Sequence, residues 1–518
     1  MITCTKCAAI QGVETCTVEI EVNASGFGEE PRITIIGLPD ASIRESRERI
    51  CSALSSNNFR IPHGATTVNL APADLRKSGS AFDLGIALCL LAACRVFPGD
   101  QLRQSLIVGE LSLDGQVRPV PGVLPMILHA RQLGLKCALV PQANVQEAAV
   151  VEGISVYGVG TLAEAVLFFR EHRGLIPVRV DLEQVFHGVA APQADFAEVK
   201  GQEAAKRALV IAAAGSHNIL LIGNPGVGKS LLANRIPSIL PDLSLQEALE
   251  VTKIHSIAGV LPHGVSLIVR RPFRSPHHSV SDAGLLGGGK AIPRPGEISL
   301  AHNGVLFLDE LPEFRRTALE ALRQPLESGT ICLSRAAGSF TFPARIMLVA
   351  AMNPCPCGYY GSTRHRCTCS PMMRRNYRAR LSGPLVDRLD LHIEVPPLSD
   401  EVLTGGHTGE NSASMREKVA AARKIQMERF RGEGIFDNAS MGGKLLDRHC
   451  RLTPACREFL LNAIQTLNMS ARAYDRILRV SRTIADLAGA QDLAEEHLLE
   501  AMNYRCLDRD DSASASFS

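Results

Sequence analysis

A glycine-rich loop near the middle of the chain has the composition of a phosphate-binding site. The stretch ILLIGNPGVGKS (219–230) consists of an apolar strand followed by the loop, and the helical sequence LLANRI comes next. Glycines allow backbone N–H groups to surround phosphate oxygens, and the positive end of the following helix attracts the same group. The residues expected to bind the nucleotide are Gly223, Asn224, Pro225, Gly226, Val227, Gly228, Lys229 and Ser230.

Two side chains of this loop would make specific contacts. Lys229 would reach the β- and γ-phosphates, and the hydroxyl of Ser230 would ligate Mg²⁺. The alternative is a glycine loop that arises by chance, but the strand before it and the helix after it argue against that reading. The loop therefore predicts ATP and Mg²⁺ as cofactors.

Two further strands end in polar residues that would complete an ATPase site. In GVLFLDEL (304–311), Asp309 would hold Mg²⁺ and Glu310 would polarise the attacking water, unless the strand merely ends in an acidic turn. In RIMLVAAMN (345–353), the Asn353 side chain could orient that water beside the γ-phosphate. Because parallel strands deliver their ends to one edge of a sheet, these residues predict ATP hydrolysis.

Four cysteines follow Asn353 in the stretch MNPCPCGYYGSTRHRCTCS (352–370). Two pairs of thiols across a glycine-containing loop can close a tetrahedral Zn²⁺ site, and in a reducing compartment we expect metal rather than two disulfides. Such a site would shape the loop without doing chemistry. Free thiols are the alternative, and His365 is an alternative ligand. The expected zinc ligands are Cys355, Cys357, Cys367 and Cys369.

Three short basic clusters suggest contact with a nucleic acid. Arginines on loops that face the channel of a ring would neutralise the phosphates of a threaded strand, and Phe273 or Tyr377 could stack on bases. The alternative is a solvated face or ion pairs at a subunit interface. The clusters are RRPFRSPHH (270–278), RHR (364–366) and RRNYRAR (374–380).

The segment TICLSRAAGSFTFPAR (330–345) predicts a β-hairpin inserted before the third strand. Ring ATPases with such an insert often grip nucleic acid with its tip, so Arg335 is a candidate contact.

The composition of the whole chain is that of an ordinary globular protein. Its 518 residues are too many for one core, and 46% are hydrophobic and 21% charged. The formal charge of +2 neither supports nor excludes a polyanionic partner. The apolar run LGIALCLLAAC (84–94) is too short to cross a membrane, and the N-terminus has no signal-peptide pattern, so we expect a cytoplasmic protein with no membrane partner.

The pattern of strands and helices predicts an α/β protein of several domains. Strands are expected at 32–38, 66–72 and 137–142, and an amphipathic helix at 41–54. The expected organisation is an α/β domain at 1–170, a linker at 171–192, an α/β ATPase core with the cysteine cluster at 193–400, and a helical lid at 415–508.

Three long stretches resemble the magnesium-chelatase-like AAA+ ATPases, and within them the bacterial YifB/ComM family. These stretches are 198–230, 271–314 and 382–396, and the resemblance extends over the chain to about residue 508. Asn224 replaces the usual proline, and Ser230 replaces the commoner threonine but keeps the metal-binding hydroxyl. The resemblance implies a homo-hexameric ring with ATP bound between subunits.

The same resemblance implies roles for two arginines. Arg388, in GPLVDRLD, matches the arginine finger that reaches the γ-phosphate of a neighbouring subunit. Arg472, in SARAYDRILR, matches the sensor arginine of the helical domain. From the residues alone, both could equally be surface arginines in ion pairs.

The first domain resembles the proteolytic domain of Lon-type proteases, in DLGIALCLLA (83–92) and in 106–144. Alignment with Lon places Ala81 at the position of the nucleophilic serine and Leu124 at that of the activating lysine, so the domain is expected to be catalytically inactive. The alternative is that Ser80 acts with Lys77 as a new base. A similar inactive Lon-like domain occurs in the RadA recombination ATPases, where it joins the ring and contacts DNA.

Together these resemblances imply a ring-forming helicase that drives branch migration of single-stranded and branched DNA during homologous recombination in natural transformation. Its cycle would use Lys229, Asp309, Glu310, Asn353, Arg388 and Arg472. The alternatives are a protein-remodelling ATPase of the magnesium-chelatase type, an ATP-dependent Lon-like protease, and a scaffold without turnover.

Overall fold

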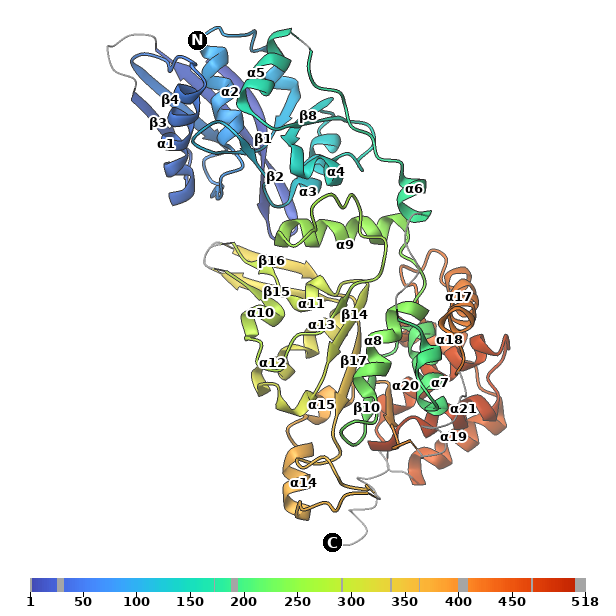
Figure 1. Ribbon diagram of the computed structural model, residues 1–518. Helices are drawn as coiled ribbons and strands as arrows, with labels where there is room; N and C mark the ends of the chain where they lie inside the picture. The colour runs from blue at the N-terminus through green and yellow to red at the C-terminus, as the bar shows by residue number, and fades with distance from the viewer. Residues whose placement is uncertain are drawn as a thin grey trace.

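The computed structural model shows two α/β domains and a helical domain, as the sequence predicts (Figure 1). The first domain lies at one end of the molecule, and the second domain and the helical domain lie side by side beyond it. The structure describes residues 2–25, 32–171, 173–187, 194–289, 292–335, 338–362, 364–398, 409–466 and 469–507.

The first domain is built on a seven-stranded sheet with the order β3-β4-β2-β1-β5-β8-β9. The long hairpin of β1 and β2 is antiparallel, whereas β5, β8 and β9 continue the sheet in parallel. The strands are β1 (Ile2–Gln11), β2 (Glu14–Ala24), β3 (Arg32–Ile36), β4 (Ala65–Ala71), β5 (Ser105–Ile107), β8 (Cys137–Pro141) and β9 (Ser155–Val159), with β6 (Glu110–Leu111) and β7 (Val117–Arg118) as a separate ribbon.

One helix of this domain is apolar on all sides because it lies inside the core. Of the eleven residues of α2 (Asp83–Ala93), only Ala93 is not fully buried, and this burial accounts for its near-absence of polar residues. The expected strands correspond to β3, β4 and β8, and the expected helix to α1 (Ala41–Ser56). The remaining helices are α3 (Val123–Gln132), α4 (Val145–Ala148) and α5 (Leu162–Glu171).

The second domain has a five-stranded parallel sheet with the order β11-β14-β17-β10-β18. Its strands are short, and those in the centre are buried on both faces, as is typical of a parallel sheet between helical layers. The strands are β10 (Ile219–Ile222), β11 (Phe273–Arg274), β14 (Gly304–Leu308), β17 (Ile346–Met352) and β18 (Leu391–Glu394).

Helices and two small ribbons surround this sheet. The hairpin predicted at 330–345 is present as the antiparallel pair β15 and β16. The helices are α7 (Glu203–Gly215), α8 (Lys229–Ile239), α9 (Leu245–Ala258), α10 (Asp282–Leu286), α11 (Glu297–Leu300), α12 (Arg316–Ala321), α13 (Arg323–Ser328), α14 (Pro371–Arg378) and α15 (Gly383–Val386), and the ribbons are β12 (Gly287–Gly288) with β13 (Arg294–Pro295) and β15 (Thr330–Arg335) with β16 (Gly338–Pro343).

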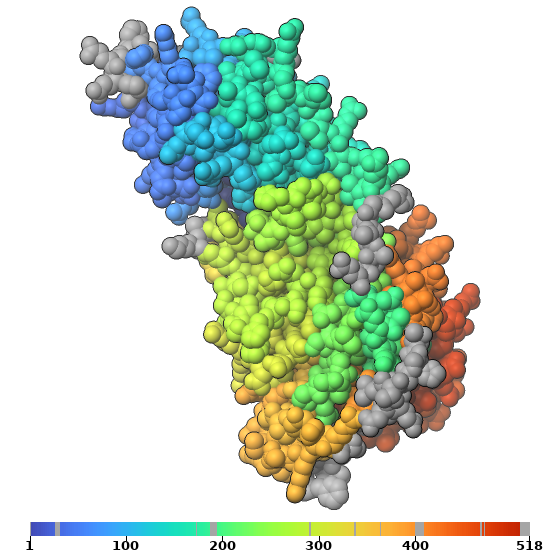
Figure 2. All heavy atoms as spheres, in the orientation of Figure 1, coloured from blue at the N-terminus to red at the C-terminus, as the bar shows by residue number. Residues whose placement is uncertain are grey.

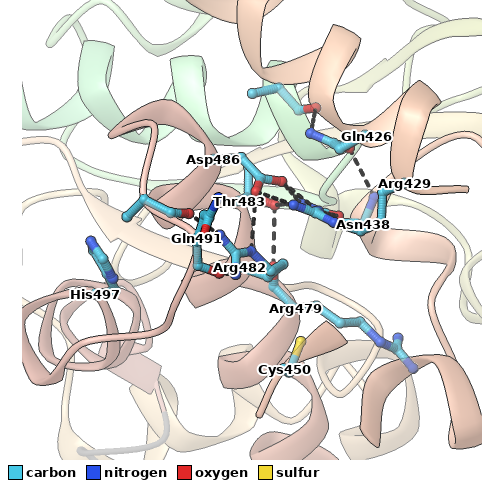
Figure 3. A network of polar contacts seen from close by, with 12 residues as sticks. Gln426, Arg429, Asn438, Cys450, Arg479, Arg482, Thr483, Asp486, Gln491 and His497 are labelled. Atoms are coloured by element: carbon cyan, nitrogen blue, oxygen red, sulfur yellow. Dashed lines mark hydrogen bonds and ion pairs between the residues drawn. The ribbon is translucent and has the colours of Figure 1, made fainter. Parts of the chain in front are cut away.

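The helical domain contains a buried ionic network. Figure 3 shows Asp486 of α20 between Arg429, Arg482 and Asn438, and its carboxylate accepts hydrogen bonds from all three. Thr483, one turn earlier, contacts His217 of the ATPase core at 2.7 Å, so the network continues across the domain boundary. The helices are α17 (Ser412–Arg429), α18 (Gly443–His449), α19 (Pro454–Thr466), α20 (Ala471–Leu487) and α21 (Glu495–Asn503).

The first domain rests on helix α9 of the ATPase domain (Figures 1 and 2). The hydroxyl of Ser256 donates to the buried carboxylate of Glu147, and its carbonyl accepts from the N–H of Gly122 at 2.9 Å. The β1–β2 turn at Gly12 approaches Phe340 of the inserted hairpin. Both contacts join the two domains through α9 and the hairpin.

The segment expected as a linker at 171–192 contains a short helix, α6 (Leu182–His187). Its apolar residues pack against Ala248 and Val251 of α9 together with Val150 of the first domain. The described part of this segment therefore adds to the contact between the domains.

Candidate ATPase site

The phosphate loop lies between the end of β10 and the start of α8. Gly226 and Gly228 have φ angles of +81° and +93°, a left-handed conformation that residues with a Cβ rarely adopt. No atom lies within 4 Å of the position that a Cβ on Gly226 would occupy, so the loop is open on that side. This geometry leaves space beside the N-terminus of α8 for a phosphate group.

Lys229 is buried and lies against the loop. Its Nζ donates to the carbonyl of Gly223, to that of Asn224 at 3.0 Å and to Oδ1 of Asn353 at 3.0 Å. Burial lowers the pKa of Lys229, although the carboxylates of Asp309 and Glu310 oppose this effect. An anionic phosphate would compensate for the desolvation of the ammonium group.

The Ser230 hydroxyl donates to Oδ2 of Asp309 at 2.6 Å, and Oδ1 of Asp309 accepts from the N–H of Glu310 at 2.9 Å. A hydroxyl and a carboxylate at this separation are hard oxygen donors of the kind that Mg²⁺ prefers. The side chains of Lys229, Ser230, Asp309 and Asn353 thus meet at one edge of the sheet. Lys229 and Ser230 begin α8, after the loop that follows β10, whereas Asp309 and Asn353 directly follow β14 and β17.

Glu310 has a partner that the sequence analysis did not identify. His278, which lies four residues after β11, places Nδ1 3.3 Å from Oε2 of Glu310. Glu310 itself has a φ of +53°, and its side chain is 54% exposed, so its carboxylate is accessible to solvent. The sequence signal for this contact was the pair His277–His278. The pair ends a basic cluster, and that cluster was interpreted as a surface for DNA.

Arg388 and Arg472 lie outside this group of contacts and close to one another. Arg388 pairs with Glu327 and donates to the carbonyl of Pro384 at 2.7 Å. Arg472 lies 3.4 Å from Asp387, the residue before Arg388, and its side chain is 66% exposed. Both arginines are therefore in ion pairs within the chain.

The four cysteines converge to one point. All four Sγ atoms lie within 4.8 Å of one another, with 3.4 Å between Cys355 and Cys357, 3.8 Å between Cys355 and Cys367, and 3.6 Å between Cys357 and Cys367. Tetrahedral Zn²⁺ with Zn–S bonds of about 2.3 Å requires S···S separations of about 3.8 Å. The arrangement fits a zinc ion, whereas His365 packs its ring on Tyr359 and is not one of the converging groups.

The thiols differ in their environments. Backbone N–H groups of Tyr359 and Thr368 lower the pKa of Cys357 to about 5, whereas burial raises the pKa of Cys355 to about 12. A metal ion would stabilise all four groups as thiolates.

The structure corrects part of the expected nucleic-acid surface. Tyr377 is only 6% exposed, so its ring is not free to stack on a base. Phe273 is partly buried and packs on Phe307 with ring centroids 6.1 Å apart. Arg271 pairs with Glu247, and Arg274 pairs with Glu297. These arginines of the first cluster are thus in internal ion pairs. Arg335, in contrast, is exposed on the hairpin.

The first domain has no serine–lysine pair at the predicted turn. The Ser80 hydroxyl donates to Glu110, and the buried Lys77 ammonium donates to the carbonyl of Pro72. Leu124 is fully buried in α3, where its side chain serves the core. These contacts give Ser80 no lysine base and favour the inactive assignment over the Lon-like protease. Among the described residues, no helix has the length and apolar character needed to cross a membrane.

Comparison with protein families gives three matches along the chain. Residues 18–144 match the model described as subunit ChlI of Mg-chelatase, residues 195–403 match magnesium chelatase subunit ChlI, and residues 409–505 match the C-terminal part of that subunit.

Comparison with curated proteins gives relatives of the same length. The chain is 46% identical to competence protein ComM of Haemophilus influenzae over 505 residues, which are 97% of each chain. It is 42% identical to the YifB protein of Escherichia coli over 504 residues, 97% of this chain and 96% of that one. The DNA repair protein RadA of Escherichia coli is 30% identical over 152 residues, 26% of this chain and 32% of that one.

Proposed function

The chain belongs to the YifB/ComM family of magnesium-chelatase-like AAA+ ATPases, and on this premise we propose that it is a ring-forming, ATP-driven DNA motor. Acting as a helicase on single-stranded and branched DNA, it would promote branch migration during homologous recombination in natural transformation. The observation that carries this proposal is 46% identity to a competence protein over 97% of both chains. It is combined with an ATPase site in which Lys229 contacts Asn353 and Ser230 contacts Asp309. Similarity to a DNA repair protein supports DNA as the substrate.

Each residue of the site has a role that its contacts support. Lys229 and the N–H groups of the loop bind the β- and γ-phosphates, and Ser230 and Asp309 hold Mg²⁺, which neutralises phosphate charge. Glu310 accepts a proton from the attacking water. Asn353, which contacts Lys229, orients that water beside the γ-phosphate.

Arg388 and Arg472 would act on the ATP of a neighbouring subunit in a homo-hexamer. Arg472 pairs with Asp387, the residue before Arg388, and this proximity supports a common role. Arg388 would leave Glu327 when a neighbouring γ-phosphate offers a stronger anionic partner. The Glu327 carboxylate is 70% exposed and open to solvent, so it competes weakly with a phosphate for Arg388.

A second candidate function is remodelling of a protein substrate, as in the magnesium chelatases. The matches to ChlI models along the chain favour it. It uses the same ATPase site, so only the substrate distinguishes the two candidates.

The test is ATP turnover and strand release on a labelled three- or four-way DNA junction, with wild type and Lys229→Ala compared side by side. We expect junction DNA to stimulate turnover and only the wild type to release a strand. If ATP is hydrolysed while DNA neither stimulates turnover nor is remodelled, the DNA motor is excluded and protein remodelling takes its place.

A further inference from the structure

In one stretch of the ATPase domain, all of the charged side chains are basic. No aspartate or glutamate occurs between Glu327 and Asp387, although the chain as a whole has nearly equal numbers of acidic and basic residues. This stretch contains Arg335, Arg345, Arg364, Arg366, Arg374, Arg375, Arg378 and Arg380. Six of these eight arginines lie close together in sequence around the cysteine cluster and α14, so the positive charge is local.

We call residues 354–362 and 364–380 the cysteine knob. Figure 1 shows α14, which belongs to it, at the end of the molecule opposite the first domain. Three exposed large side chains lie within this short segment: Tyr360 is 43% exposed, Met372 65% and Met373 50%. Single exposed apolar residues are ordinary on a protein surface, but here they are grouped in one segment together with unopposed positive charge.

Two of its arginines have no internal counter-charge. Arg366 and Arg375 are exposed, and their side chains make no ion pair or hydrogen bond within the described parts of the chain. Arg374 lies over the ring of Tyr360, with its guanidinium carbon 4.2 Å from the ring centroid. This pair presents a flat cationic and aromatic surface of the kind on which bases stack.

The buried side of the knob touches the ATPase site. The hydroxyl of Tyr377 lies against the backbone N–H of Asn353, whose side chain accepts from Lys229. Gly358 packs on Pro225 of the phosphate loop so closely that a Cβ on Gly358 would lie 2.6 Å from Cγ of Pro225. A short chain of direct contacts thus connects α14 to the lysine that would bind phosphate.

We propose that the cysteine knob binds single-stranded DNA, with Arg366 and Arg375 on phosphates and Tyr360 against a base, and that Tyr377 and Asn353 transmit this occupancy to the phosphate loop. This proposal rests on the proposed DNA motor. The knob would be the surface on which the motor binds a strand, and the contact between Tyr377 and Asn353 would couple strand binding to the ATPase site. Charge complementarity favours nucleic acid over a protein partner, because the surface lacks the acidic residues that mixed protein interfaces contain.

The binding test compares Arg366→Ala/Arg375→Ala with the matched control Arg431→Ala/Arg457→Ala, which removes two exposed arginines of the helical domain. Binding of a fluorescent oligo(dT) is measured by anisotropy over a range of salt concentrations. Each phosphate contact contributes about 0.7 to the salt slope for a single strand, so the knob variant should lose about 1.4 and the control none. Tyr360→Ala should weaken binding about fivefold or more through lost stacking.

The coupling test uses Tyr377→Phe, which keeps the buried ring and removes only the hydroxyl. We expect its affinity for oligo(dT) to match that of wild type, while the ratio of DNA-stimulated to basal ATP turnover falls toward one. Circular dichroism and the melting temperature show whether the variant is folded, and Tyr504→Phe serves as a control that removes a phenol hydroxyl elsewhere.

The outcomes separate this inference from the proposed function. If wild type binds oligo(dT) and the knob variant has an unchanged salt slope, the strand binds elsewhere and the knob assignment is wrong. If Tyr377→Phe keeps full stimulation, the coupling route is wrong. If wild type itself binds no DNA and DNA leaves its ATP turnover unchanged, the DNA motor fails, and the knob inference fails with it.

Discussion

At the scale of single residues, the contact between Glu310 and His278 has the clearest consequence for chemistry. A general base must hold its carboxylate toward the attacking water, and an exposed glutamate has several rotamers that do not. His278 restricts that freedom through Nδ1, 3.3 Å from the carboxylate. We therefore assign His278 as a positioning residue for the proposed base.

His278→Ala should lower kcat for ATP hydrolysis about tenfold, because a misplaced general base loses much of its effect, while KM for ATP stays unchanged. Steady-state ATPase assays provide both values. His278→Asn, which keeps a hydrogen-bond donor, should recover part of the loss. His263→Ala, which removes an exposed histidine elsewhere in the domain, is the control and should have little effect. A rise in KM with constant kcat would contradict the assignment.

At the scale of elements, the cysteine loop and helix α20 are both held in place by contacts between residues that are separated in the sequence. The loop between β17 and α14 has little hydrophobic content of its own, so four thiols at one point are its main means of fixing a shape. Helix α20 is attached to the ATPase core by Arg476, which pairs with the buried Asp390 at 2.6 Å.

We predict about one zinc ion per chain in protein purified without chelator, as four thiolates satisfy a tetrahedral site. Cys367→Ser should lose the metal, whereas Cys332→Ser, which removes an exposed thiol of the hairpin, should keep it. Elemental analysis of the purified proteins gives the stoichiometry. Metal-free wild type would favour free thiols and exclude the zinc site.

Asp390 should contribute stability that depends on pH. Burial raises the pKa of Asp390, but Arg476, His217 and the N–H of Asn218 outweigh it, so the pKa lies well below the ordinary value. A carboxyl whose folded-state pKa is depressed stabilises the fold above its unfolded pKa of about 3.9 and loses this contribution as pH falls further.

Asp390→Asn should therefore reduce the free energy of unfolding by about 3 kcal/mol at pH 7, because it leaves Arg476 without its buried partner. The difference from wild type should shrink below about pH 4. Urea unfolding followed by circular dichroism measures both values. Asp387→Asn, whose partner Arg472 is exposed, is the control and should change stability by less than about 1 kcal/mol. An equal loss at pH 7 and pH 3 would show that charge is not the cause.

At the scale of the whole molecule, the proposed ring requires that one subunit complete the active site of the next. The phosphate loop and Arg388 make separate sets of contacts within the chain, as expected if they serve different ATP molecules. Subunits that lack one function can then complement subunits that lack the other.

Lys229→Ala and Arg388→Ala should each abolish most ATP turnover, whereas rings formed by co-expressing both should recover activity. With random mixing, about a quarter of the interfaces combine an intact phosphate loop with an intact Arg388, so turnover should reach about a quarter of wild type if the finger acts in trans. ATPase assays on tagged, co-purified rings measure the recovery. No recovery in mixed rings would indicate that Arg388 acts within its own subunit.

The sequence by itself determined the features that depend on neighbouring residues. The phosphate loop, the acidic end of β14 and the cysteine pairs are contiguous, because backbone N–H groups, strand ends and short spacings specify their chemistry locally. The same holds for the α/β class and for the hairpin of β15 and β16, which follow from hydrophobic periodicity.

Only the tertiary structure decided which side chains from distant parts of the sequence come into contact. Parallel pairing of β11 with β14 brings His278 to Glu310, and packing of α14 buries Tyr377, which the sequence had assigned to a binding surface. Two of the three arginines of the first basic cluster, Arg271 and Arg274, likewise pair with Glu247 and Glu297. Periodicity reports which face of an element is apolar, but partner identity depends on how separate elements pack, and no local pattern encodes that.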